Sequence, residues 1–221
     1  MSWDPVWEKV FSSQQWGKYP GEDLIRFVAR NFYKAEDRSV IRILEIGCGP
    51  GANLWYMARE GFKVYGIDGS SSAVTQAQQY LNASVPGWEG EVIKGDIINQ
   101  PYQDGWFDAI IDNEAGSCNS YENALLIYKE AHRVLKPGGK IFIRTFAEGS
   151  WGEGTGERLA PDAWSCSQGP LAGKGYSRFT KQSQIPELLA GFEIESIEKL
   201  DRTMDDMKQV VSEWLVNGVK K

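Results

Sequence analysis

The stretch I-R-I-L-E-I-G-C-G-P-G-A-N, from Ile41 to Asn53, organises the rest of the chain. A run rich in β-branched residues leads into three glycines, and a helix-compatible segment follows. This order of strand, glycine turn and helix places backbone N–H groups at a helix N-terminus, where glycine lets a ligand approach closely. The stretch therefore predicts a cofactor-binding loop, and the glycine pattern alone leaves the cofactor open.

The composition fits a soluble protein with one hydrophobic core. Of the 221 residues, 42% are hydrophobic and 24% are charged, and no apolar run approaches the ~18 residues of a membrane span. The first residues include Asp4 and Glu8 and lack a signal-peptide profile. The widely spaced Cys48, Cys118 and Cys166 predict neither a disulfide framework nor a zinc cluster. We expect a cytoplasmic protein without a metal site, acting as a monomer or a homodimer.

The alternation of strand and helix patterns predicts the fold class, which is α/β with a doubly wound, Rossmann-like sheet. We expect strands at 40–46, 63–67, 91–94, 107–111 and 140–146, and helices at 21–33, 51–60, 70–81, 121–135 and about 180–190. Pro186 can take a first-turn position and so confine the last of these helices to the second half of its range. Two further strands, 192–200 and 210–219, have a short polar link and should be antiparallel. The expected sheet is thus seven-stranded and mostly parallel, with an antiparallel C-terminal strand and helices on both faces.

Residues 1–221 are expected to form a single domain with four parts. These are an N-terminal helical cap at 1–37, a cofactor-binding core at 40–146, an inserted substrate-side loop at 148–179, and a C-terminal helix and β-hairpin at 180–221. Residues 148–175 are rich in glycine and show no sustained periodicity, and so long a loop is more often functional than incidental. Residues 16–22 have two interpretations: the entry to the first helix, fixed by Pro20, or a lid over the ligand.

Two classes of cofactor compete for the glycine loop. Gly47, Gly49 and Ala52 fit the dinucleotide pattern, with Asp68 about 20 residues further on. Glu45 lies inside the strand, where an unpaired carboxylate is costly, so it should meet a cation or the backbone donors of the loop. Pro50 removes an N–H that a pyrophosphate would use. The antiparallel pair at the end of the chain is also not expected for an open dinucleotide-binding sheet.

Motifs along the chain carry a family resemblance. In order they are E-I-G-C-G-P-G from Glu45, Y-G-I-D-G-S from Tyr65, K-G-D-I from Lys94, F-D-A-I-I-D from Phe107 and L-K-P-G-G-K from Leu135. Together they resemble the class I S-adenosylmethionine-dependent methyltransferases over about residues 40–146, and the last two strands resemble the final hairpin of that fold. The resemblance implies S-adenosyl-L-methionine as the cofactor and S-adenosyl-L-homocysteine as the product.

The resemblance also implies roles for residues at the strand ends. Asp68 would accept hydrogen bonds from both ribose hydroxyls, Asp96 would bind the adenine amine, and Asp112 or its backbone would face the methionine ammonium. Each aspartate has an alternative interpretation as a helix cap or turn residue. The remaining residues of the expected cofactor site are Glu45, Gly47, Cys48, Gly49, Asn53, Gly69, Ser70, Ile97 and Tyr19.

Methyl transfer from a sulfonium is an in-line displacement with a neutral leaving group, so the enzyme mainly aligns the reactants and excludes water. A hydroxyl or ammonium acceptor also needs a base. Glu114, which follows Asp112 closely, is the expected catalytic residue, and Tyr19 and Tyr176 are alternatives. The chain's only histidine, His132, is interpreted as structural because it lies in a predicted helix away from the strand ends.

The acceptor is expected to be a small molecule, a sugar or a biosynthetic intermediate, methylated at oxygen or nitrogen. The family's nucleic-acid amino-methylating motif, D/N/S-P-P-Y/F, is replaced here by Asp-Asn-Glu-Ala at 112–115, and the net charge is -6; both argue against a nucleic-acid substrate. No membrane partner is expected. Aromatic side chains would supply apolar walls and arginines an anion site, although loop packing and surface ion pairs are alternatives. The expected acceptor-side residues are Trp16, Asn113, Arg144, Trp151, Tyr176 and Arg178.

Two other functions are compatible with the same sequence. One is an enzyme of this fold that uses another group of the cofactor, as in aminopropyl transfer. The other is a cofactor-binding protein without catalysis. Isotope transfer distinguishes the three hypotheses, because only a methyltransferase moves a labelled methyl group to a product.

Overall fold

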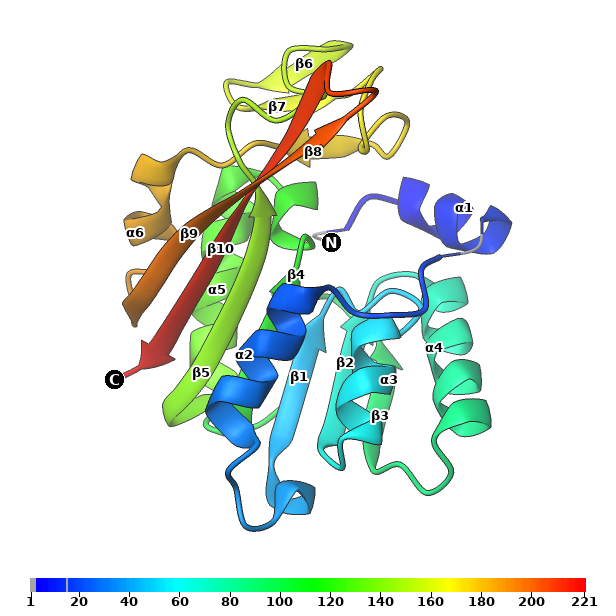
Figure 1. Ribbon diagram of the computed structural model, residues 1–221, viewed down its shortest axis with the longest axis vertical. Coiled ribbons are helices and arrows are strands. Elements are labelled where there is room, and N and C mark those ends of the chain that lie inside the picture. Colours follow the sequence, from blue (N-terminus) through cyan, green and yellow to red (C-terminus); the bar gives the residue numbers. More distant parts are fainter. Residues whose placement is uncertain (1–2, 15) are drawn as a thin grey trace.

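A seven-stranded sheet forms the centre of the protein, seen in a computed structural model that describes residues 3–14 and 16–221 (Figure 1). The strand order is β3-β2-β1-β4-β5-β10-β9. Strands β1 to β5 pair in parallel, and β10 is antiparallel to both β5 and β9. The strands are β1 Arg42–Ile46, β2 Lys63–Asp68, β3 Gly90–Lys94, β4 Phe107–Asn113, β5 Leu135–Phe146, β9 Phe192–Met204 and β10 Gln209–Lys220. The predicted Rossmann-like fold is confirmed, including its antiparallel C-terminal strand.

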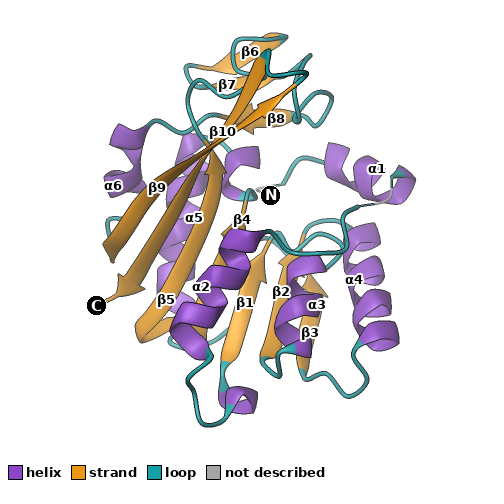
Figure 2. Ribbon diagram, viewed as in Figure 1, coloured by secondary structure: helices purple, strands orange, loops and turns teal. Residues whose placement is uncertain are grey.

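Helices cover both faces of the sheet (Figure 2). One face carries α2 Glu22–Phe32, α3 Ala52–Arg59 and α4 Ser71–Ser84, and the other carries α5 Tyr121–Val134 and α6 Ile185–Leu188. A further helix, α1 Val6–Ser13, lies near the C-terminal ends of the parallel strands and contacts α4 (Figure 1). It was not among the helices expected from the sequence.

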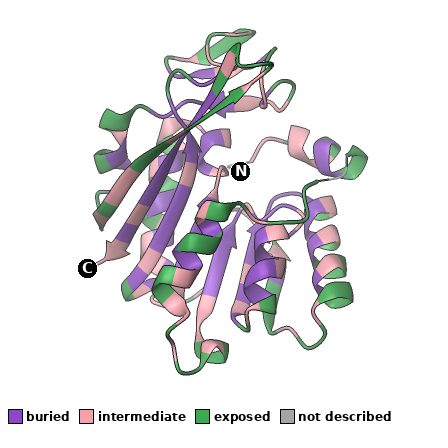
Figure 3. Ribbon diagram, in the orientation of Figure 1, coloured by how far each residue is buried: buried purple, intermediate pink, exposed green. Residues whose placement is uncertain are grey.

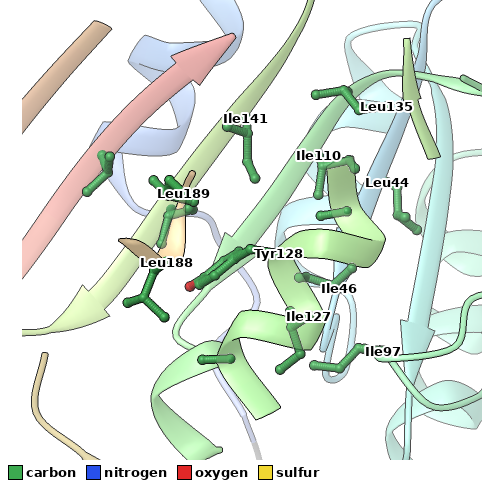
Figure 4. Close-up of a cluster of buried hydrophobic side chains, with 14 of the residues drawn as sticks. Leu44, Ile46, Ile97, Ile110, Ile127, Tyr128, Leu135, Ile141, Leu188 and Leu189 are labelled. Carbon is green, nitrogen blue, oxygen red and sulfur yellow. The ribbon is translucent and has the colours of Figure 1, made fainter. Parts of the chain in front are cut away.

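The core consists of one apolar layer on each side of the sheet. The α5 side buries Leu44, Ile46 and Ile110 of the central strands against Ile127 and Tyr128 (Figure 4). The opposite side buries Ile43 against residues of α2 and α3. Because β1 alternates between the two layers, it is buried from Ile43 to Ile46, while Arg42 at its start is half-buried (Figure 3).

One expectation for the second half of the chain is wrong. The loop expected at 148–179 contains a small antiparallel sheet of β6 Glu157–Ala160, β7 Ala163–Ser165 and β8 Tyr176–Arg178. These strands are too short to show an alternating pattern, and they pack over a separate apolar cluster that includes Phe146 and Phe179.

The helix expected at about 180–190 is confined to the second half of that range, as the position of Pro186 indicated: the 3₁₀ turn Gln182–Gln184 leads into the short α6. Pro186 occupies the first turn of α6, where its missing N–H is not needed. The buried Leu188 and Leu189 then end the helix against the core, and the chain enters β9. β9 itself is longer than expected and reaches Met204.

The described part of the chain contains no helix that combines the length and the apolar character needed to cross a bilayer.

Replacing Ile46 by alanine should lower the free energy of unfolding by about 2–5 kcal/mol, because the side chain is fully buried and its removal leaves a cavity at the centre of the sheet. Val40→Ala is the matched control, since Val40 is 62% exposed and its loss should cost no more than ~0.5 kcal/mol. Urea denaturation measures both values. Equal effects of the two substitutions would contradict the assigned core.

Candidate functional site

A cavity of about 310 Å³ opens at the C-terminal ends of β1, β2 and β4. This is the place where the strand order reverses on either side of β1, and open parallel sheets bind ligands at such a point. Its walls come from the glycine loop after β1, the strand ends, and the N-terminal segment of residues 3–21. Segments far apart in the sequence therefore meet at one site.

The glycine loop is held close to the sheet edge by backbone geometry. Gly47 and Gly51 have φ values of 63° and 86°, a region that side chains disfavour. A Cβ atom on Gly47 would lie 2.4 Å from the Cβ of Ala115. The N–H groups of Gly47 and Cys48 both donate to the carbonyl of Ile67 in β2, at 2.8 and 3.2 Å. Glycine at these positions therefore lets the loop turn tightly from β1 into α3.

Glu45 is a buried carboxyl group at the base of the cavity. Its Oε1 accepts a hydrogen bond of 2.5 Å from the side-chain amide of Asn53 in α3, so its observed partner is a side chain and neither a cation nor a backbone donor of the loop. Its Oε2 has no hydrogen-bond partner among the described residues. Burial raises the pKa of Glu45 to about 8. The unpartnered oxygen makes Glu45 suited to a cationic or hydrogen-bond-donating ligand group.

Asp68 ends β2 and is held in place by backbone donors. Oδ2 accepts the N–H of Gly49 at 2.8 Å, and Oδ1 accepts the N–H of Ser70 at 2.8 Å. Burial raises the pKa of Asp68, while these two hydrogen bonds oppose the shift. Because a carboxylate oxygen accepts more than one hydrogen bond, both oxygens retain acceptor capacity toward the cavity.

The N-terminal segment covers the cavity. Glu8 in α1 accepts hydrogen bonds from the hydroxyls of Ser70 and Ser72 at 2.6 and 2.5 Å. Asp4 accepts the backbone N–H of Tyr176 in β8 at 3.1 Å. The segment thus bridges α4 and the small sheet.

Aromatic rings line the underside of this cover. Trp7, Phe11 and Trp16 contact one another with ring centroids 5.4–6.0 Å apart, and all three line the cavity. Trp16, Gly17, Tyr19 and Gly21 also line it, which favours the lid interpretation of residues 16–22.

Glu114 lines the same cavity and directly follows β4. Its φ of 77° is unusual for a residue with a side chain, and its N–H donates to the carbonyl of Arg144 at 2.8 Å. Burial, followed by the neighbouring carboxylate of Glu213, raises its pKa to about 8. Such a group can take up a proton near neutral pH.

Most of the site residues expected from the sequence line this cavity. They are Tyr19, Glu45, Gly47, Cys48, Gly49, Asn53, Asp68, Gly69 and Ile97 of the expected cofactor set, and Trp16, Asn113, Glu114 and Arg144 of the acceptor and catalytic sets. The cavity lining does not include Ser70, Asp96, Asp112, Trp151, Tyr176 or Arg178.

Asp112 and Arg178 have structural positions in place of the expected contacts with ligands. Asp112 is fully buried and accepts hydrogen bonds from the N–H of Gly116 and, at 2.8 Å, from the hydroxyl of Tyr128. Burial raises its pKa to about 6. Arg178 is also fully buried and donates to the carbonyls of Gly116 and Asn119. Both side chains therefore brace the turn after β4, and an anion site at Arg178 is excluded by its burial.

The other four residues are also engaged elsewhere. Ser70 is buried as the N-cap of α4. Asp96 accepts the N–H of Ile98 at 3.3 Å, a turn-type contact. Trp151 packs on the cluster beneath the small sheet, and Tyr176 pairs with Ser165 in that sheet. The last two positions could not be read from the sequence because they depend on how the segment after β5 folds.

Several cavity residues were not expected from the sequence. Asp4 and Phe11 come from the N-terminal segment, and Cys118, Asn119 and Leu171 come from the turn after β4 and the segment before β8. The spacing of Trp7 and Phe11, one helical turn apart, was the available signal for the first group. Asn119 gave no such signal, although its buried Oδ1 has no hydrogen-bond partner among the described residues.

The donor and acceptor set fits S-adenosylmethionine. The acceptors are the free Oε2 of Glu45 and the carboxylate of Asp68, which match an ammonium and ribose hydroxyls. Within residues 3–14 and 16–221, no group of three or more His, Cys, Asp and Glu side chains is arranged to hold a metal. His132 packs edge-on against Phe192, outside the cavity lining.

Comparison with known proteins gives a consistent assignment. Residues 43–139 match the family described as "Methyltransferase domain". The chain is 31% identical over 132 residues to a sterol 24-C-methyltransferase of Eremothecium gossypii, covering 57% of this chain and 34% of that protein. It is 34% identical over 118 residues to a malonyl-[acyl-carrier protein] O-methyltransferase of Pseudescherichia vulneris, covering 53% and 43%. The chain thus spans less than half the length of these two relatives.

Among solved structures, a SAM-dependent methyltransferase from Methanosarcina mazei superposes with a TM-score of 0.65 at 22% identity, covering 85% of this chain and 94% of that one. This likeness concerns the fold. Residues 43–139 thus match a methyltransferase domain, and both the fold and the ordered sequence motifs agree with the class I S-adenosylmethionine-dependent methyltransferases that the sequence resembles.

Proposed function

We propose that this protein transfers a methyl group from S-adenosylmethionine to an oxygen or nitrogen atom of a small-molecule acceptor. The observation that carries the proposal is one cavity whose lining includes the hydrogen-bond-accepting carboxyls of Glu45 and Asp68 together with Glu114, whose proton affinity is raised. The first two suit the methyl donor and the third suits an acceptor that must lose a proton. Residues 1–37 would form the cap, 40–146 the cofactor-binding core, and 148–221 the acceptor side and the closing strands.

The proposed cofactor end uses groups that are already oriented. Asn53 and the backbone N–H groups of Gly49 and Ser70 fix the carboxyls of Glu45 and Asp68 before any ligand arrives. Preorganised acceptors of this kind lose little freedom on binding. A cationic ligand group beside Glu45 would favour its ionised form, offsetting the effect of burial. When bound, the cofactor supplies an electrophilic methyl group on a positively charged sulfur.

The proposed acceptor end combines apolar walls with few polar groups. Trp7, Phe11 and Trp16 line the cavity and would exclude water from it. Asn113 and the unpartnered Oδ1 of Asn119 would orient its polar part. Arg144 lines the cavity, but its guanidinium already binds Glu213, which leaves it less suited to the anion site expected from the sequence.

Glu114 would act as the general base. As the acceptor attacks the methyl carbon, the proton of its O–H or N–H group would move to the Glu114 carboxylate. A base is available only in its deprotonated form, and the pKa of Glu114 is raised to about 8. The rate should therefore rise with pH up to about 8.

The small volume of the cavity, about 310 Å³, and the net charge of -6 support a small acceptor over a nucleic acid. The two relatives named above carry names that refer to a sterol carbon and to an oxygen of an acyl-carrier-bound acid. Because these names refer to different acceptor atoms, the methylation of oxygen or nitrogen by this protein is a proposal. We further propose a cytoplasmic protein that works without a metal.

Calorimetry should detect binding of S-adenosylmethionine and S-adenosylhomocysteine, with no comparable affinity for NAD. Asp68→Asn should weaken binding of both by roughly 10- to 100-fold, because one charge-assisted acceptor is lost. Asparagine still accepts a hydrogen bond, so the contact with the backbone of Gly49 or Ser70 can persist and the fold should be kept. Asp206→Asn, in the exposed tip between β9 and β10, is the control and should bind normally. Unchanged affinity in Asp68→Asn would remove Asp68 from the cofactor site.

Incubation with methyl-labelled cofactor and a metabolite mixture, read by mass spectrometry, should reveal a product that carries the labelled methyl group. With that acceptor, Glu114→Gln should lower kcat by about 10²- to 10⁴-fold, because glutamine cannot take the proton. Cofactor affinity should change little in this variant. A Glu114→Gln enzyme with wild-type kcat would exclude Glu114 as the base, and transfer of an aminopropyl group in place of methyl would contradict the proposed reaction.

A further inference from the structure

An ion pair across two strands lies beside the proposed base. Arg144 in β5 and Glu213 in β10 are diagonal neighbours on one face of the sheet, because Glu213 pairs with Phe146 in register. The Arg144 Nε donates to Oε1 of Glu213 at 2.9 Å, and a second guanidinium N–H donates to Oε2. The side chains of Arg144 and Glu213 are only 15% and 4% exposed. The two side chains therefore form a bidentate, largely buried ion pair with fixed geometry.

Glu114 lies near the same guanidinium but makes a longer and weaker contact with it. Its Oε1 lies 3.5 Å from the Nε of Arg144, the nitrogen that already donates to Glu213. Two carboxyl groups thus compete for one cation, and Glu213 holds the better position. Gly21, at the start of α2, covers the guanidinium: a Cβ atom on it would lie 3.0 Å from an Arg144 nitrogen. Hydrogen bonds from Arg144 to Glu213 and packing by Gly21 thus keep the guanidinium beside Glu213.

The other charged groups around Glu114 do not change this balance. Lys174, before β8, attracts the carboxylate and lowers the pKa of Glu114, but less than Arg144 does. Its ammonium lies 5.0 Å from the ring centroid of Trp16. Cys118, in the turn after β4, is a neutral thiol there because burial raises its pKa. Asp23 in α2 acts on Arg144 and adds further negative charge.

We propose that Glu213 is a positioning residue for the methyl transfer: by binding Arg144 through both oxygens, it withholds the guanidinium from Glu114 and so keeps Glu114 able to accept a proton. The inference rests on the proposed function, in which the acceptor gives up a proton. In that step the acceptor atom forms a bond to the methyl carbon, the carbon–sulfur bond breaks with its electron pair remaining on sulfur, and the O–H or N–H proton passes to the Glu114 carboxylate.

The proposal is tested by titrating Glu114 directly. In protein labelled with ¹³C at glutamate carboxyls, the Glu114 signal is identified by its absence in Glu114→Gln and followed by NMR as a function of pH. The wild-type midpoint should lie near 8. In Glu213→Gln the midpoint should fall by more than ~1 pH unit, because one negative charge is lost and Arg144 is released to pair with Glu114.

A second variant separates charge from contact. Glu213→Asp keeps the negative charge, but the aspartate side chain is one methylene shorter and cannot accept both guanidinium hydrogen bonds of Arg144 in the same geometry. The midpoint should therefore fall in this variant too, by less than in Glu213→Gln. Because Glu213→Asp leaves no buried charge without a counter-ion, it also serves if Glu213→Gln does not fold. Glu198→Gln, an exposed carboxylate on the neighbouring strand β9, is the control and should titrate as wild type.

A wild-type midpoint in Glu213→Asp, or in a folded Glu213→Gln protein, would overturn the proposal. The rising limb of kcat/KM against pH should move with the NMR midpoint in each variant, a change that a merely structural role for Glu213 would not produce. Failure of the proposed function has a different signature, because labelled methyl would then reach no acceptor while the NMR titration still decides the role of Glu213.

Discussion

The parallel pairing of β1 with β2 on one side and with β4 on the other is the constraint on which the rest of this structure depends. A strand buried on both faces must satisfy all of its backbone groups within the sheet, and β1 does so between two neighbours. Parallel strands end at the same edge, so the residues that follow β1, β2 and β4 meet there. The chain leaves β1 through a glycine loop whose positive φ values carry it directly into α3. The cavity exists because the loops on either side of β1 diverge at that edge.

The cover of the cavity follows from a different set of interactions. The N-terminal segment is not part of the sheet and has few backbone hydrogen bonds to it. It is tied down by carboxylates, since Glu8 binds the hydroxyls of Ser70 and Ser72, and Asp4 binds the backbone of Tyr176. Side-chain contacts of this kind are individually modest, so the cover is held less firmly than the core beneath it.

Carboxylates of similar appearance in the sequence serve different purposes here because their surroundings differ. Asp112 is enclosed and fully hydrogen-bonded by Tyr128 and Gly116, which makes it a brace for the turn after β4. Glu45 is equally buried but keeps one oxygen without a partner among the described residues. Glu114 shares its nearest cation with Glu213. Buried polar groups are normally satisfied, so the unpartnered oxygen of Glu45 and the cation that Glu114 shares with Glu213 are the features on which the proposed ligand binding and proton transfer depend.

The sequence by itself determined the order of strands and helices along the chain and the glycine loop proposed to bind the cofactor, because these depend on local patterns. The glycines after Ile46 require backbone angles that other residues disfavour, and the strand ends follow from short apolar runs. The pattern was too brief to reveal the small sheet of β6, β7 and β8, and the helix before β9 is cut short by burial of Leu188 and Leu189. Only the tertiary structure decided that Arg178 braces a turn, that Asn119 joins the cavity, and that Glu213 holds Arg144 beside Glu114. The reason is physical. Whether a charged side chain is free to bind a ligand or supports the fold depends on which groups lie within hydrogen-bond distance of it in the folded chain, and those groups come from strands and turns far away in the sequence.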